Sequence, residues 1–214
     1  MDAQQAAQVL DALDALYPEA RAELHFSNPF ETLIATILSA QCTDKRVNMV
    51  TERLFADYPD AESMASLSAE QLEPMIKECG LFRNKAKNIV AACRALMTEH
   101  SGVVPKTREA LMALPGVGQK TAGVVLLAAF GDDQIPVDTH VFRVANRIGL
   151  THANTADKTE QQLREILPRD TWSHAHHLFI WHGRRCCHAR GPECARCPLQ
   201  KDKLCVSSHE YIQE

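Results

Sequence analysis

The chain has 214 residues, 45% of them hydrophobic, and a net charge of −4. Its length and hydrophobic content support a globular protein of one large or two small domains. Its longest apolar stretch, Ala122 to Phe130, is less than half of the roughly 20 residues that a membrane-spanning helix needs, so we expect no membrane contact. The negative charge argues against nucleic-acid binding, but residues 1–44 hold seven acids against one base, and the remainder is slightly basic.

The N-terminal segment lacks the features of a targeting sequence. No Lys or Arg precedes Arg21, whereas signal and transit peptides carry basic residues in that region. We therefore expect a cytoplasmic protein. In such a reducing compartment, the clustered cysteines among the eight in the chain are expected to bind metal in preference to forming disulfides.

Apolar residues recur at helical spacing along most of the chain, and no segment shows the clear alternation of a strand. Examples are Val9, Leu10, Leu13 and Leu16; Leu33, Ile34, Ile37 and Leu38; and Val141, Val144, Ala145 and Ile148. Predicted helix starts are Asn28-Pro29 with Glu31, and a capping box of Ser68 and Gln71. Predicted helix ends are Gly80, Gly149 and Gly183. The pattern indicates an all-α fold of about ten helices.

Residues 107–130 read as two helices joined by the tight turn Leu114-Pro-Gly-Val-Gly-Gln-Lys120. The two glycines, Gly116 and Gly118, allow a sharp reversal of the backbone. Gly118 falls at the N-cap of the second helix, whose free amide groups and positive dipole end favour a phosphate. Alone, such a turn is more often an ordinary connection between helices than a binding site.

Lys120 is a candidate nucleophile because it lies in the first turn of that helix, where the dipole disfavours the charged ammonium. The alternative is a phosphate-binding or simply exposed lysine. Asp138 is expected to cap the helix that follows Pro136-Val137, and two antiparallel helices would bring it back towards Lys120. Its alternative role is that of a helix cap alone.

Four cysteines near the C-terminus, Cys187, Cys194, Cys197 and Cys205, have the spacing Cys-x6-Cys-x2-Cys-x7-Cys. Four thiolates at this spacing suit either an iron-sulfur cluster or a tetrahedral zinc site. Cys186 beside Cys187 leaves the register of the first ligand open. None of the five nearby histidines is expected to bind metal, and Cys42, Cys79 and Cys93 are expected to be buried small hydrophobic residues.

Five ordered motifs make the chain similar to the helix-hairpin-helix DNA glycosylases, and within them to the endonuclease III family. They are LSAQCTD (38–44), GLFRNKAKNI (80–89), LPGVGQKT (114–121), VDTHVFRVANR (137–147) and the cysteine tail. The resemblance implies a bilobal fold with one lobe at residues 22–132 and the other at 1–21 plus 133–214, which holds an iron-sulfur loop at about 186–205. It also implies a monomer in the cytoplasm, associated with the nucleoid in a bacterium.

The resemblance implies base-excision repair of double-stranded DNA with damaged pyrimidines or abasic sites. Lys120 would attack the sugar, form a Schiff base and lead to β-elimination, with Asp138 assisting. Leu81 would be an intercalating wedge and Gln41 would fill the space of the extruded nucleotide, although their residue types alone suggest a core leucine and a surface glutamine. Gly116 and Gly118 would bind the DNA backbone.

For the cysteine tail, the resemblance implies a 4Fe-4S cluster with a structural role, holding Arg190 and Arg196 against phosphates. The interval before Cys205 is two residues longer than is common in the family. Six bases against two acids in residues 184–203 are consistent with a phosphate-facing patch, or with ordinary surface. Two other functions stay open: a monofunctional mismatch glycosylase, which typically lacks the lysine, and a non-catalytic DNA-binding module whose metal site has four cysteine ligands.

Overall fold

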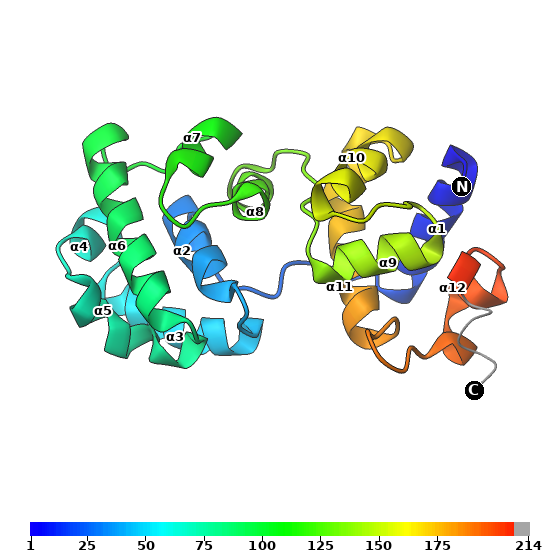
Figure 1. Cartoon of the computed structure of the whole chain (residues 1–214), viewed down its shortest axis with the longest axis horizontal. Coiled ribbons are helices and arrows are strands. Elements are labelled where there is room, and N and C mark those ends of the chain that lie inside the picture. Colours follow the sequence, from blue (N-terminus) through cyan, green and yellow to red (C-terminus); the bar gives the residue numbers. More distant parts are fainter. Residues whose placement is uncertain (208–214) are drawn as a thin grey trace. The chain divides into compact units, whose positions relative to one another are not determined.

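A computed structural model describes residues 1–207, and within this range the chain forms helices and no strands (Figure 1). The prediction of an all-α fold is therefore confirmed. The chain divides into two compact units, one of residues Ala22–Asp132 and one of Met1–Arg21 together with the residues from Asp133 on. We call them the central unit and the terminal unit. No helix in the described range has the length and apolarity needed to cross a bilayer.

The central unit contains seven α-helices around one apolar core, with a short 3-10 segment between the fourth and fifth. They are α2 (Pro29–Ser39), α3 (Asp44–Asp57), α4 (Ala61–Ala65), α5 (Ala69–Ile76), η1 (Lys77–Cys79), α6 (Phe82–Glu99), α7 (Arg108–Ala113) and α8 (Gln119–Phe130). Helix α2 packs on α8 in the middle of the unit. Helix α2 is buried along most of its length and contributes Leu33, Ile34 and Leu38 to this core.

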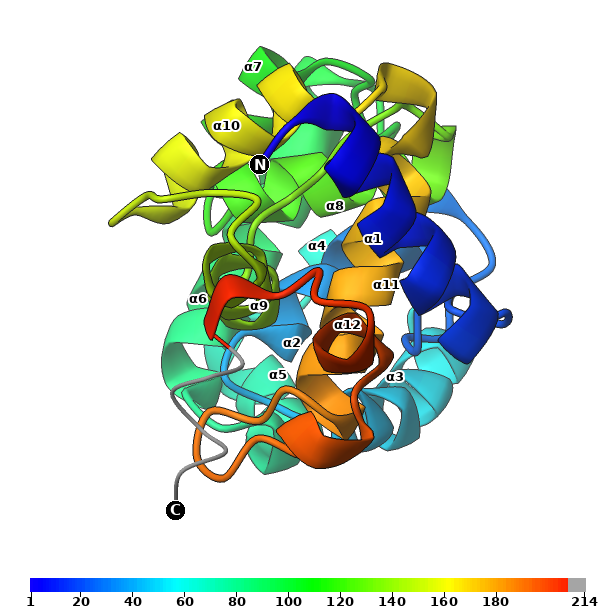
Figure 2. The same cartoon turned by 90° about the vertical axis from the view of Figure 1, so that its right-hand side faces the viewer.

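The terminal unit has its own core, formed by helices from both ends of the sequence. They are α1 (Ala3–Leu16), α9 (Thr139–Ile148), α10 (Ala156–Ile166), η2 (Arg169–Thr171), α11 (Trp172–Arg185), η3 (Cys194–Arg196) and α12 (Pro198–Lys201). Helix α11 packs against α9, and α1 lies against both α11 and α12 (Figure 2). Burial of Leu13 and Phe179 holds the N-terminal helix to this unit.

Most of the capping signals act as the sequence predicts. The Asn28 side chain accepts a hydrogen bond from the Glu31 amide, with Pro29 in the first turn. Ser68 and Gln71 form a reciprocal capping box at the start of α5. Gly80 and Gly149 end their helices in positive-φ conformations, at +63° and +94°. The sequence predicts these caps correctly because each cap depends only on residues within one helical turn.

The prediction that a helix ends at Gly183 is wrong, because α11 continues through it to Arg185. The glycine serves the contact between α11 and α9. A Cβ at Gly183 would lie 3.0 Å from both Arg143 Nη2 and His140 Cβ. Its carbonyl accepts a hydrogen bond of 2.9 Å from Arg143 Nη2. A larger side chain would therefore push the two helices apart.

Candidate active site and metal centre

The hairpin between α7 and α8 is anchored by apolar residues on either side of its glycines. Leu114 and Val117 are buried, and the Val117 amide donates to the Leu114 carbonyl at 3.1 Å. Gly116 has a φ of +78°, and a Cβ there would lie 2.7 Å from Asn88 Cβ. Gly118 is the N-cap of α8, as predicted, with extended backbone and open space where a Cβ would lie. The two glycines therefore have different functions: Gly116 makes the turn, and Gly118 leaves the helix start uncovered.

We expect Gly116→Ala to lower the free energy of unfolding by about 1–3 kcal/mol, because it adds left-handed strain and a clash with Asn88. Gly118→Ala is the matched control and should change it by less than about 1 kcal/mol, since its φ of −96° is ordinary for alanine. Urea denaturation of both variants measures the difference. Equal stabilities would contradict the assigned role of Gly116.

Lys120 is exposed in the first turn of α8 and belongs to the central unit. Its side chain makes no ion pair or hydrogen bond with any residue in the range 1–207. Its neighbour Gln119 is held, because its side-chain oxygen accepts a hydrogen bond of 2.9 Å from Arg108 on α7. The backbone under Lys120 is thus fixed while its amine stays available to a ligand.

Asp138 is the N-cap of α9 in the terminal unit, as predicted. Its Oδ1 accepts hydrogen bonds of 2.8 Å from the amides of His140 and Val141. Its Oδ2 accepts none from the described residues, so one carboxylate oxygen orients the group and the other can face a reacting partner. Burial lowers the pKa of His140, which favours a neutral ring beside this carboxylate.

Gln41 and Leu81 lie in two turns of the central unit and share a left-handed backbone, with φ of 53° and 47°. We call residues 40–43 the Gln41 turn and residues 80–81 the Leu81 turn. Leu81 is 56% exposed, so it is not the core leucine that its residue type suggests. Left-handed conformations cost free energy in non-glycine residues and are concentrated at functional sites.

A buried lysine that the sequence analysis did not single out connects these two turns. Lys85 Nζ donates hydrogen bonds to the Leu38 carbonyl at 2.9 Å and to the Cys79 carbonyl at 2.7 Å. Leu38 precedes the Gln41 turn and Cys79 precedes the Leu81 turn. Burial lowers the pKa of Lys85. One ammonium therefore fixes the approach of the backbone to both turns.

Five cysteines and one histidine line a small, largely apolar cavity in the terminal unit. They are Cys186, Cys187, Cys194, Cys197, Cys205 and His182. Ligand atoms of His182, Cys186 and Cys197 all lie within 4.8 Å of one another, close enough to hold a metal ion. Within that group, Cys197 Sγ is 3.7 Å from His182 Nε2. The clustered thiols fit a thiolate-ligated metal or iron-sulfur group.

The geometry differs from the sequence prediction in its detail. No histidine was expected to bind metal, yet His182 contacts Cys197 within the metal-capable group, and Cys186 is more deeply buried than Cys187. The Cys186 side chain and then His182 lower the pKa of Cys197, which favours its thiolate. Cys187 Sγ instead accepts a contact of 3.6 Å from Arg147 Nη1. Cys186 is the C-cap of α11 and lies four residues after His182, a spacing that was available in the sequence as a signal that the two side chains are close.

Two arginines of α9 bind the loop that carries these cysteines, residues 186–205, which we call the cysteine loop. Arg143 Nε donates to the Cys187 carbonyl at 3.0 Å. Arg147 donates to the carbonyls of His188 at 2.6 Å and Ala189 at 3.0 Å. Since Asp138 caps the start of α9, the cysteine loop and the candidate catalytic carboxylate are attached to the same helix.

The two arginines predicted to contact phosphate have different surroundings. Arg190 is exposed on the cysteine loop. Arg196 forms an ion pair with Glu193 and donates a hydrogen bond of 2.7 Å to the Arg185 carbonyl. Its charge is therefore partly neutralised within the loop, and Arg190 is the better placed of the two for an external anion.

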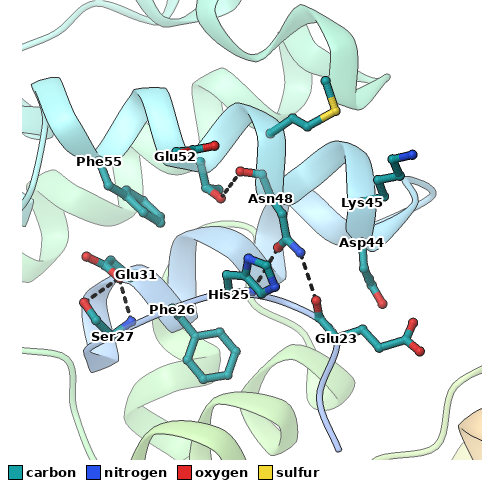
Figure 3. Close-up of a pocket in the computed structure, with 12 residues that line it drawn as sticks. Glu23, His25, Phe26, Ser27, Glu31, Asp44, Lys45, Asn48, Glu52 and Phe55 are labelled. Atoms are coloured by element: carbon teal, nitrogen blue, oxygen red, sulfur yellow. Dashed lines mark hydrogen bonds between the residues drawn. The ribbon is translucent and has the colours of Figure 1, made fainter.

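A separate pocket of about 890 Å³ opens in the central unit between the segment before α2 and helix α3 (Figure 3). Asn48 holds this segment by accepting from the His25 amide and donating to the Glu23 carbonyl, both at 2.9 Å. Four carboxylates line the pocket, from Glu23, Glu31, Asp44 and Glu52. None of the predicted site residues lines it, and its acidic lining disfavours phosphate.

Comparison with known proteins identifies the family. Residues 34–169 match the HhH-GPD superfamily of base-excision DNA repair proteins. Endonuclease III of Synechocystis is 46% identical over 206 residues, covering 96% of this chain and 93% of the relative. Endonuclease III of Escherichia coli is 44% identical over 193 residues, covering 90% and 92%. The chain belongs to the endonuclease III family.

Solved structures agree with this membership of the endonuclease III family. A non-covalent endonuclease III–DNA complex superposes with a TM-score of 0.95 at 43% identity and full coverage of both chains. A trapped endonuclease III–DNA covalent intermediate superposes with a TM-score of 0.93 at 44% identity and 98% coverage of both. The chain is accordingly an enzyme of base-excision repair, a DNA glycosylase and lyase, and the predicted helix-hairpin-helix glycosylase fold is confirmed.

Proposed function

We propose that this enzyme removes oxidised pyrimidines from double-stranded DNA and cleaves the abasic sites that result, through a Schiff base on Lys120. The observation that carries the proposal is the free amine of Lys120 in the first turn of α8, directly after the hairpin. We further propose that it acts as a monomer where the chromosome lies, in the cytoplasm and on the nucleoid of a bacterial cell.

The proposed reaction uses the Lys120 nitrogen as nucleophile. Its lone pair attacks C1′ of the deoxyribose, and the bond to the base breaks, so that the base leaves with the bonding electrons and takes up a proton. The sugar ring then opens and the C1′–N bond becomes an imine. Loss of the 2′ proton to a base moves an electron pair towards this imine and expels the 3′ phosphate.

Asp138 is proposed to assist in two ways. The negative charge of its carboxylate stabilises the cationic character of the sugar as the base leaves, the demand that carboxylates meet in glycosidases. Its Oδ2, which accepts no hydrogen bond from described residues, is suited to receive a proton from the lysine ammonium. The helix-capping bonds through Oδ1 hold the carboxylate in one orientation during both steps.

DNA binding is proposed to rely on backbone groups more than on net charge. The amides at the start of α8, left uncovered by Gly118, suit a phosphate oxygen, as does the turn formed by Gly116. Arg190 adds a positive charge from the cysteine loop. The ion pair between Arg196 and Glu193 stabilises the conformation of that loop. We propose Leu81 as the wedge that enters the duplex and Gln41 as the side chain that occupies the vacated space.

We expect Leu81→Ala to raise the Kd for duplex DNA containing an abasic-site analogue by about tenfold or more, because the wedge offsets the unstacking cost of a few kcal/mol. The free energy of unfolding should change by less than about 0.5 kcal/mol, since the side chain is 56% exposed. Leu16→Ala, at a 42% exposed position on α1, is the matched control and should leave both quantities unchanged. Unchanged affinity in the Leu81 variant would remove its assigned role.

The cysteine loop is proposed to hold a 4Fe-4S cluster through Cys187, Cys194, Cys197 and Cys205. When bound, such a cluster joins four thiolates and so cross-links the loop. The contacts from Arg143 and Arg147 to the backbone at Cys187 to Ala189 support this assignment of the first ligand, because they orient that part of the loop. Cys186 is more deeply buried than Cys187, so we assign its side chain to packing beside His182 and Cys187 to the cluster.

Anaerobically purified protein should contain about four iron and four sulfide per chain. We expect Cys187→Ala to lose most of this iron and Cys186→Ala, its neighbour and matched control, to retain it. Iron and acid-labile sulfide analysis with the visible spectrum measures both. The reverse pattern would move the first ligand to Cys186, and a colourless protein that contains only zinc would contradict the cluster.

Borohydride trapping tests the proposed reaction directly. The wild-type holoenzyme, mixed with a duplex that contains one abasic site, should form a covalent protein–DNA adduct after reduction of the imine. Duplexes that carry single oxidised pyrimidines should yield the same adduct. Incision of abasic DNA without any trapped adduct would exclude the Schiff base while leaving DNA cleavage intact.

A further inference from the structure

Lys85 on α6 is a buried cation that no described carboxylate neutralises. Its side chain is 4% exposed, and no described residue forms an ion pair with it. Burying an ammonium without a carboxylate costs free energy unless its protons are hydrogen-bonded. Two of its protons are, to the Leu38 carbonyl at 2.9 Å and to the Cys79 carbonyl at 2.7 Å. The chemistry proposed for Lys120 and Asp138 uses neither contact.

Both carbonyls that accept these bonds belong to helix ends. Leu38 lies in the last turn of α2, and Cys79 is the last residue of η1. Carbonyl groups at a helix end have no hydrogen-bond partner within their own helix. A single ammonium that donates to both therefore satisfies two helix ends at once. Because each bond is shorter than 3.0 Å, it also holds the two ends close together.

The chain runs from each of these helix ends into a turn that is proposed to contact DNA. The Gln41 turn begins two residues after Leu38, and the Leu81 turn follows Cys79 directly. Gln41 and Leu81 are both exposed, and both have a left-handed backbone. A left-handed conformation costs free energy in a non-glycine residue and persists only where the surrounding structure holds it. The bonds of Lys85 lie immediately before both turns and can supply this restraint.

We propose that Lys85 is a positioning residue that sets the spacing of the Gln41 turn and the Leu81 turn, so that both side chains enter damaged DNA together. This inference rests on the proposed DNA-binding roles of Gln41 and Leu81. The Lys85 backbone amide also donates to the Leu81 carbonyl at 3.1 Å, which attaches it to that turn a second time. Extruding a nucleotide unstacks the duplex, and the contacts of the wedge and of the filling side chain offset that cost.

Helix α6 also contacts the hairpin, but through a different residue. Asn88 lies three positions after Lys85, and a Cβ at Gly116 would lie 2.7 Å from Asn88 Cβ. The hairpin, which is proposed to bind phosphate, is therefore packed on α6 without using the Lys85 ammonium. Loss of the ammonium should weaken binding that needs an extruded nucleotide and spare phosphate contacts made by the hairpin.

Lys85→Met tests this selectivity in the holoenzyme, because methionine keeps much of the length of lysine but donates no hydrogen bond. We expect the Kd for duplex DNA with an abasic-site analogue to rise about tenfold, and the Kd for undamaged duplex to change by less than about twofold. Lys87→Met removes an exposed charge from the same helix and is the matched control. It should leave both constants close to those of the wild type.

Fluorescence of 2-aminopurine placed beside the abasic-site analogue supplies a second measurement. The fluorescence of this base rises when it is unstacked, so it reports entry of the wedge into the duplex. At saturating enzyme, Lys85→Met should give a smaller rise than the wild type and Lys87→Met an equal one. A substitution that only destabilised the fold would lower the amount of complex but not the signal of the saturated complex.

A double-mutant cycle shows whether Lys85 acts through the two turns. In the Gln41→Ala/Leu81→Ala enzyme, Lys85→Met should raise the Kd for the abasic-site analogue by less than about twofold, because neither side chain remains to be positioned. Each variant is titrated to its binding stoichiometry, so that unfolded protein is not counted. Lys85→Met leaves two buried carbonyls without a donor and so lowers stability. Lys85→Gln is therefore the second variant, since it keeps a donor but is shorter than lysine, and we expect the same selective loss.

Wild-type affinity and fluorescence in both Lys85 variants would overturn the inference and leave the roles of Gln41 and Leu81 intact. An equal loss of affinity for abasic and undamaged duplex would also overturn it, as would a full Lys85→Met effect in the Gln41→Ala/Leu81→Ala enzyme. Unchanged affinity of the Gln41→Ala/Leu81→Ala enzyme itself would reject the proposed roles of those two residues and this inference with them. The Schiff-base reaction of Lys120 would then still stand or fall on borohydride trapping.

Discussion

Replacing Lys120 with glutamine is expected to abolish the borohydride-trapped adduct and to lower abasic-site cleavage by about 10⁴-fold or more, because the proposed imine forms on the Lys120 amine. Glutamine keeps much of the length and polarity of lysine but has no nucleophilic amine. The Lys120 side chain is exposed and makes no described hydrogen bond, so the free energy of unfolding should change by less than about 0.5 kcal/mol. Single-turnover cleavage and denaturation with urea measure the two effects separately.

Lys87→Gln is the matched control for this prediction. Lys87 is also an exposed lysine of the central unit, on α6. The substitution removes the same charge from the same unit. The variant should therefore still form the trapped adduct and cleave abasic DNA at close to the wild-type rate. Continued trapping by the Lys120 variant would assign the nucleophile to another residue.

Replacing Asp138 with asparagine is expected to lower the rate of base release by about 10²–10⁴-fold, because the charge opposite the developing cation is lost. Asparagine is as good an N-cap as aspartate, and its oxygen can keep the bonds to the amides of His140 and Val141. The start of α9 should therefore stay intact. Pre-steady-state release of an oxidised pyrimidine measures the chemical step apart from product release.

Asp138→Ala is the comparison that separates the cap from the charge. It should slow base release to a similar extent, and it should also destabilise the protein by about 1 kcal/mol because both cap bonds are lost. Equal stability of the two variants would contradict the capping role. Full activity of Asp138→Asn would contradict the role of the charge and leave Asp138 as a helix cap alone.

Local features of this protein follow from the sequence by itself. The helices are predictable from apolar spacing, and the caps at Asn28, Ser68 and Asp138 are predictable because each bond joins groups within one turn. The helix-hairpin-helix motif and the cysteine spacing are equally local. Residue order alone therefore predicts the fold class, the family and the positions of Lys120 and Asp138 at helix starts.

Other features depend on contacts between distant parts of the chain, which local pattern does not encode. Gly183 resembles a helix end, but its absent side chain serves the contact with Arg143 forty residues earlier. Lys85 resembles a surface lysine, yet it is buried because the carbonyls of Leu38 and Cys79 replace its water.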